Sequence, residues 1–146
     1  MRLDDQTRAE LVGALGDELQ SRLGMLPRPE LLFDSVRNGS SLAALLRAAE
    51  RTPASLLLLR ERGTGSQRSR QFGAFCATGW SRAQGGTFGD ARGFLFSVRD
   101  GTAAMLPARE ADECFAHASS AHGIGFGGSV GAFGLGLEPG ARRFQH

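Results

Sequence analysis

The sequence contains no lysine, since all 17 of its basic residues are arginine. Tyrosine is also missing, and Ile124 and Asn38 are the only residues of their kinds. The absence of lysine excludes a Walker-type phosphate loop, because that loop binds the phosphates through a lysine. Abundant Gly, Ala and Arg are typical of GC-rich coding DNA. The formal charge of +2 therefore reflects arginine in place of lysine, and we expect no nucleic-acid partner.

Cysteine and long apolar runs are scarce. Cys76 and Cys114 are the two cysteines, and the longest aliphatic run, Leu56–Leu59, is far too short to span a bilayer. The first residues include early acids and no apolar core, unlike a secretory signal or a mitochondrial presequence. We expect a soluble cytoplasmic protein without membrane insertion, whose two thiols are reduced and buried.

The size and composition indicate one packed domain. A chain of 146 residues has room for one hydrophobic core, and 41% hydrophobic with 22% charged residues is ordinary for globular proteins. Ten phenylalanines persist although their codons are AT-rich, so we expect them to mark the core. The phenylalanines expected between two antiparallel sheets are Phe33, Phe72, Phe75, Phe94, Phe96, Phe126 and Phe133.

The first third predicts two helices and a strand. Leucines at four-residue spacing from Leu11 to Leu23 form one apolar stripe, and Thr7–Glu10 fits a capping box for that helix. Residues 31–36 predict a strand followed by an Asn-Gly turn. Ser40 or Ser41 can cap a second helix, whose apolar face carries Leu42, Leu45 and Leu46.

The remaining pattern predicts short strands. Leu56–Leu59 is typical of a buried strand, and 72–77 and 94–98 are rich in aromatic residues. The segment 99–102 is a hairpin signal. Short successive strands imply antiparallel sheets, and helices confined to the first third give the class α+β.

Glycine is dense from His122 to Gly140, and residues 123–128 form a literal G-x-G-x-x-G. A dinucleotide fingerprint needs a strand before this motif and a helix after it. Residues 133–137 are strand-like instead, so close packing of strands is the favoured interpretation and we expect no cofactor.

Taken together, these segments resemble the TLDc family, which includes the oxidation resistance proteins. The order and spacing of the matching segments carry the resemblance; these are 31–35, 37–42, 56–59, 72–75, 87–89, 94–96, 124–128 and 133–137. The resemblance implies a sandwich of two antiparallel β-sheets with flanking helices. It also implies a non-catalytic interaction module that binds and regulates the vacuolar proton-pumping ATPase and contributes to oxidative-stress resistance.

The resemblance suggests a division of the chain and a location. We expect residues 1–29 to form an amphipathic helix and linker, and 30–146 to form a TLDc-like domain that is shortened at its C-terminal end. The family usually has an aromatic residue where this chain has Gly136. A monomer peripheral to the vacuolar or lysosomal membrane, held there by a protein partner, is expected.

The candidate partner-binding residues come from the family motifs and from one arginine-rich loop. A polar loop is flanked by four arginines and contains one opposing acid, Glu61; the arginines are Arg60, Arg62, Arg68 and Arg70. This cluster is either a solvated surface or a contact for an acidic protein. The candidates in the family motifs are Arg37, Gly39, Gly73, Gly89, Gly127, Gly128 and Gly134.

A thiol-dependent enzyme using Cys114 and His117 is the alternative function, because a thiolate beside an imidazole can act as a nucleophile. These two residues and His122 are also metal-ligand types that lie within nine residues of one another. On a strand, Cys114 and His117 would face opposite sides, which argues against shared coordination. We expect no metal.

Overall fold

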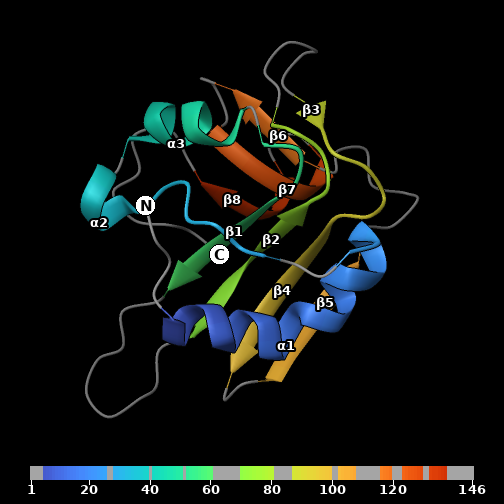
Figure 1. Ribbon diagram of the computed structural model, residues 1–146. Coiled ribbons are helices and arrows are strands. Elements are labelled where there is room, and N and C mark those ends of the chain that lie inside the picture. Colours follow the sequence, from blue (N-terminus) through green and yellow to red (C-terminus); the bar gives the residue numbers. More distant parts are fainter. Residues whose placement is uncertain are drawn as a thin grey trace.

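The structure is a computed structural model that describes residues 5–25, 28–39, 41–50, 52–60, 70–80, 87–99, 102–107, 116–119, 123–129 and 132–137. Two antiparallel sheets with helices beside them form the fold (Figure 1), so the α+β class is confirmed. The helices are α1 (Asp5–Leu23), α2 (Ser35–Asn38) and α3 (Leu42–Ala49). No helix among these described ranges is both long and apolar enough to cross a membrane.

Each sheet has four strands. The first sheet has the order β1-β2-β4-β5, with β1 (Ser55–Arg60), β2 (Gln71–Cys76), β4 (Phe94–Arg99) and β5 (Thr102–Pro107). The second sheet has the order β3-β6-β7-β8, with β3 (Thr87–Phe88), β6 (Ala116–Ser119), β7 (Gly123–Ser129) and β8 (Ala132–Leu137). All pairings in both sheets are antiparallel, and Arg99 pairs with Thr102 as the hairpin prediction requires.

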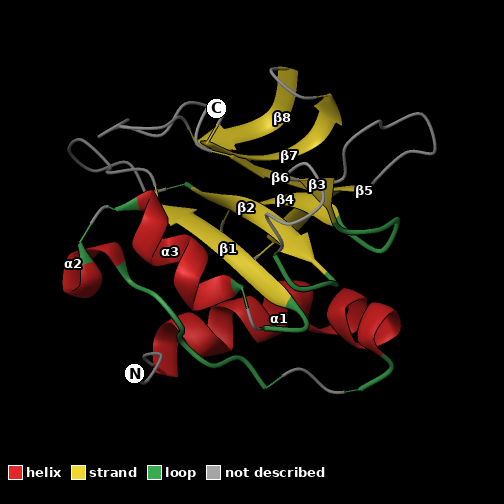
Figure 2. Ribbon diagram, turned by 90° about the horizontal axis from the view of Figure 1, so that it is seen from above, coloured by secondary structure: helices red, strands yellow, loops and turns green. Residues whose placement is uncertain are grey.

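Helix α1 covers one face of the first sheet, and the second sheet lies on the other side (Figure 2). Leu11, Leu15 and Leu19 are buried, so the predicted leucine stripe is confirmed. The predicted capping box is wrong, because the chain is already helical at Asp5 and Thr7 lies inside the helix. Thr7 is buried there and accepts a hydrogen bond from the guanidinium of Arg60 on β1, which links the helix to the sheet.

The predicted strand at 31–36 is also wrong. Residues 31–34 belong to no strand, and α2 begins at Ser35. The carboxylate of Asp34 accepts a hydrogen bond from the backbone N–H of Val36 at 2.9 Å, which caps a helical turn. Gly39 follows with φ of 81°, so the predicted turn is present. Ser41 caps α3 as expected, since its hydroxyl accepts from the N–H of Ala44.

The continuous leucine run of β1 is explained by burial on both faces. Leu57 and Leu59 belong to a core cluster formed with α3 and the second sheet. Leu56 and Leu58 pack against the cluster around α1. A strand covered on both faces needs no polar alternation, so the prediction of a buried strand is confirmed.

The phenylalanines mark the core, but most of those that are buried do not lie between the sheets. Phe75, Phe94 and Phe96 are buried in the cluster with α1, so their expected position between two sheets is wrong. Of the phenylalanines whose side chains are described, only Phe126 is buried in the cluster that joins the two sheets. The reason is that α1 forms a third layer whose leucines need large apolar partners. Phe33 and Phe72 are half-buried, and the side chain of Phe133 lies outside the described residues.

Candidate functional site

Gly73 occupies a place in β2 that admits no side chain. It pairs with Leu58 on one side and Phe96 on the other. A Cβ atom at this position would lie 1.8 Å from the carbonyl oxygen of Leu57 and 2.9 Å from the ring of Phe96. The close approach of neighbouring chain segments therefore requires glycine here, as the sequence predicted for the motif glycines.

Gly89 and Gly127 are required for their backbone conformation. Their φ angles are 90° and 70°, in the left-handed region that side chains disfavour. A Cβ on Gly127 would lie 3.8 Å from a methyl group of Leu95 on the first sheet, so space is available and conformation alone demands glycine. Gly89 follows β3 and Gly127 lies within β7, and both are scaffold residues that the backbone conformation restricts to glycine.

The G-x-G-x-x-G motif lies within a strand. Residues 123–128 fall inside β7, and the next element is the strand β8. Because a strand and not a helix is the next described element, the geometry is not that of a dinucleotide fingerprint. Gly128 pairs with Phe133 across the β7–β8 hairpin, and Gly134 lies in β8.

The structure does not bring the candidate residues into one site. Gly73 lies in the first sheet, whereas Gly127, Gly128 and Gly134 lie in the second. Arg37 and Gly39 are exposed near α2, and the guanidinium of Arg37 lies 3.8 Å from the carboxylate of Asp34. Nothing in their placement makes these residues a common binding surface.

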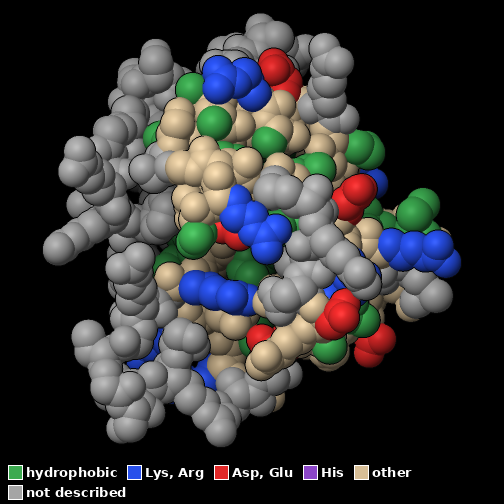
Figure 3. All heavy atoms as spheres, turned by 60° about the vertical axis from the view of Figure 1, so that its left-hand side comes forward, with side chains coloured by type: hydrophobic (Ala, Val, Ile, Leu, Met, Phe, Trp, Pro, Cys, Tyr) green, Lys and Arg blue, Asp and Glu red, His purple; other side chains and the backbone are tan. Residues whose placement is uncertain are grey.

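The predicted arginine cluster is only partly described. Arg60 at the end of β1 bonds to Thr7, and exposed Arg70 directly precedes β2. Arg62 and Arg68 lie outside the described residues. Figure 3 shows that arginine side chains on one face of the molecule are spread out, with acidic side chains beside some of them.

A hollow lies beside the first sheet on the side that faces the second sheet. Its volume is about 720 Å³, and its lining includes Arg70, Phe72, Leu95, Arg99, Ala104 and Leu135. Phe72 and Leu95 are half-buried against the shared core cluster, and Leu135 comes from β8. Pairing in the sheet places Ser97, Ala104 and Leu106 on the same face, and all three are exposed. We name the exposed residues Ser97, Arg99, Thr102, Ala104 and Leu106 the open half of the first sheet.

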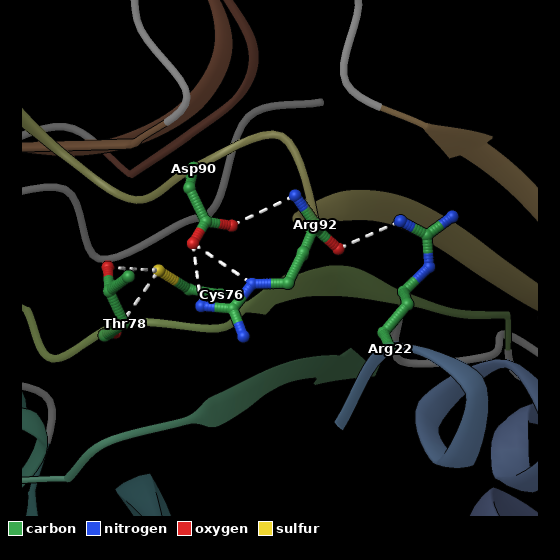
Figure 4. Close-up of polar contacts among 5 residues, drawn as sticks. All are labelled: Arg22, Cys76, Thr78, Asp90 and Arg92. Atoms are coloured by element: carbon green, nitrogen blue, oxygen red, sulfur yellow. Dashed lines mark hydrogen bonds and ion pairs between the residues drawn. The ribbon is translucent and has the colours of Figure 1, made fainter. Parts of the chain in front are cut away.

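The thiol of Cys76 is poorly suited to nucleophilic chemistry. The residue is 3% exposed, and its Sγ donates to the carbonyl of Thr78 at 3.3 Å (Figure 4). Burial raises the pKa of this thiol, although the contacts with Thr78 lower it in part. A raised pKa keeps the sulfur protonated, and the thiol is the less reactive form.

The residues of the alternative enzyme are not assembled by the described part of the chain. His117 lies on β6, where its backbone pairs with Thr87 and Gly125, and its side chain is outside the described residues. Cys114 and His122 are outside them as well. Within the described ranges, no three His, Cys, Asp or Glu residues are grouped so that they could hold a metal ion.

An acidic-basic turn next to Gly89 was not predicted (Figure 4). The carboxylate of Asp90 accepts from the backbone N–H of Arg92 at 2.9 Å and from its guanidinium at 2.7 Å. The bond to Arg92 lowers the pKa of Asp90, and burial opposes this only in part. The guanidinium of Arg22 on α1 donates to the carbonyl of Arg92 at 2.9 Å and lies 4.8 Å from the ring centre of Phe94. This turn therefore fixes the start of β4 to α1. The sequence signal was the Asp-x-Arg-Gly that follows Gly89.

Comparison with known proteins identifies the family. The sequence matches the TLDc domain over residues 7–143, which covers α1, both sheets and nearly the whole chain. No curated protein and no solved structure matches the chain significantly. Because the match extends over far more than half of the sequence, the chain belongs to the TLDc domain family.

Proposed function

We propose that this chain is a non-catalytic protein-interaction module that binds and regulates the vacuolar proton-pumping ATPase and contributes to oxidative-stress resistance. The observation that carries the proposal is the match to the TLDc domain over residues 7–143. The function that this family implies rests on a folded domain and not on one short motif. The match from α1 to β8 therefore supports the module as a whole.

The proposal extends to the arrangement of the two sheets as a sandwich. A single core cluster includes Leu57 of β1, Ala74 of β2 and Ile124 of β7, all of them buried. Trp80, which follows β2, meets the ring of Phe126 edge to face at 5.6 Å between centroids. Apolar contacts of this kind hold sheets together in sandwiches and support the proposed arrangement.

The non-catalytic part of the proposal is supported by the chemistry of the described residues. Cys76 is buried with a raised pKa, and the motif glycines have steric or conformational roles. We further propose a cytoplasmic monomer that reaches the vacuolar or lysosomal membrane through its protein partner.

A pull-down from cell lysate tests the partner. The tagged chain is the bait, and bound proteins are identified by mass spectrometry. Enrichment of vacuolar ATPase subunits over a tag-only control supports the proposal. Their absence from the captured proteins, with a bait that melts cooperatively and is therefore folded, contradicts it.

Cysteine variants test the absence of catalysis. We expect Cys76→Ser and Cys114→Ser to leave the protection of stressed cells nearly unchanged, provided that each variant remains stably folded. Thermal unfolding of the purified variants is the control. Loss of protection at unchanged stability would support the thiol enzyme that uses Cys114 and His117 instead.

A further inference from the structure

The open half of the first sheet lies on β4 and on the edge strand β5, and its two faces differ in character. On β4 the residues that face α1, Phe94 and Phe96, are large and buried, whereas Ser97 on the opposite face is small and exposed. Its partner Ala104 on β5 is also small and exposed. Leu106 leaves 64% of its surface exposed at one end of this strip. A trough of small residues results, with an apolar side chain at one end.

Two arginines lie at the other end of the trough. Gln71 of β2 pairs with Val98 of β4, so Arg70, which directly precedes β2, and Arg99, the last residue of β4, follow at the same end, and both line the hollow. Both are exposed, and neither has an ion pair or side-chain hydrogen bond within the described part of the chain. Like charges opposite each other on neighbouring strands repel. An anion between them would remove the repulsion.

Among the described residues that line the hollow beside these arginines, none is acidic. The described lining is formed by the two arginines, Gln71 and apolar or small neutral residues, with Leu135 contributed by the second sheet. A carboxylate bound at this end would therefore meet two guanidinium groups that have no acidic partner among the described residues. Arginine binds carboxylates through two parallel hydrogen bonds, which gives both strength and orientation.

We propose that the open half is a docking site for an extended acidic segment of a protein partner. One or two carboxylates of the segment bind Arg70 and Arg99, its backbone lies over Ser97 and Ala104, and an apolar residue contacts Leu106. The distance along β4 from Arg99 to Leu95 accommodates about four residues of extended chain at roughly 3.3 Å per residue. This inference rests on the proposed function as an interaction module and names the surface and partner chemistry that the module uses.

Nucleic acid fits this surface less well. Binding to a phosphate backbone depends on many basic contacts along its length, whereas the described lining supplies two arginines and several apolar groups. An alternation of acidic and apolar side chains in an extended peptide matches the trough at both ends.

Charge reversal tests the surface with a defined probe. The probe is a fluorescein-labelled peptide in which Glu alternates with Leu, and its counterpart has Lys in place of Glu. We expect the wild-type chain to bind the Glu peptide and not the Lys peptide, and Arg70→Glu with Arg99→Glu to weaken binding at least about tenfold. The matched control reverses Arg28 and Arg47, which are exposed outside the hollow, and should change affinity less than about twofold.

The same variants in the lysate pull-down separate the two proposals. If the wild-type chain captures the ATPase and the Arg70→Glu, Arg99→Glu chain captures it equally, the docking surface is wrong while the proposed function stands. If the Glu peptide binds through these arginines but no ATPase is captured, the surface stands and the proposed partner is wrong. Tighter binding of a single-stranded oligonucleotide than of the Glu peptide overturns the acidic partner. If the Arg70→Glu, Arg99→Glu variant does not fold, the Arg70→Gln, Arg99→Gln variant replaces it in both binding experiments.

Discussion

One face of the first sheet is covered across all four strands by α1, whereas the second sheet and α3 cover the opposite face mainly over β1 and β2. On the covered face, Phe75, Phe94 and Phe96 are buried, and Ala103 and Met105 of β5 still pack against the cluster around α1. On the opposite face, burial ends at Leu95, and Ser97 and Ala104 are exposed. The same strands thus serve as core on one side and as surface on the other.

The difference shows how burial in β4 and β5 follows what covers each face. Residues that alternate along one strand point to opposite sides, so β4 places the rings of Phe94 and Phe96 under α1 and presents Ser97 and Arg99 on the opposite face. We therefore expect substitutions on the covered face to reduce stability, and substitutions on the open half to change binding with little effect on stability.

The largest contrast is expected between two leucines. Leu15 on α1 is 1% exposed, so Leu15→Ala should lower the free energy of unfolding by about 2–5 kcal/mol through lost burial and a residual cavity. Leu106→Ala on the open half should change it by no more than about 0.5 kcal/mol, because Leu106 is largely exposed. Urea denaturation measures both values. Equal losses for the two variants would show that Leu106 is covered and that the comparison is wrong.

A smaller loss of stability is expected from a methyl group at Gly73. The added Cβ would meet the backbone of Leu57, so Gly73→Ala should lower the free energy of unfolding by about 1–3 kcal/mol. Gly13→Ala is the matched control, because a Cβ at this helical position meets nothing within 4 Å. That control should raise stability by roughly 0.5–1 kcal/mol. A neutral Gly73→Ala would mean that β1 and β2 are further apart than the structure has them.

The smallest effect is expected at Asp90, and it depends on pH. Arg92 lowers the pKa of Asp90 in the folded state below the ordinary value of 3.8. A lowered pKa stabilises the fold above 3.8, and this contribution is lost as the pH falls through the folded-state pKa. Asp90→Asn should therefore melt slightly below the wild type at pH 7, and the gap should shrink below pH 4. Thermal melts of both proteins at pH 7, 4 and 3 measure this difference in melting temperature. A difference that widens in acid would contradict stabilisation by the bond between Asp90 and Arg92.

Much of this architecture follows from local patterns in the sequence. The leucine stripe of α1, the serine cap of α3 and the run Leu56–Leu59 each indicate their element directly. The segment 31–36 misled because its apolar residues are typical of a strand, whereas the Asp34 cap and the absence of a pairing strand favour a helical turn. Which layer receives Phe75, Phe94 and Phe96 could not be predicted, because alternation separates the two faces of a strand without saying what covers each.

The candidate site was predicted less well for a physical reason. Motif glycines mark positions where chain segments approach closely, as at Gly73, or where φ is positive, as at Gly127. These two positions lie in different sheets. The open half is formed from residues that look unremarkable along the chain, such as Ser97 and Ala104. The exposure of this surface depends on which elements of the fold cover it. The position of Arg70 near Arg99 likewise depends on the register of β2 and β4, which cannot be read from either segment of the sequence alone.

The proposed interaction with the vacuolar ATPase can be measured by binding of the purified chain, immobilised through its tag, to the purified ATPase in detergent. We predict saturable binding by the wild-type chain and by the Cys76→Ser and Cys114→Ser variants alike, since interaction and not thiol chemistry is the proposed activity. No saturable binding by a chain that shows a cooperative thermal transition would contradict the proposal that this TLDc domain acts on the ATPase.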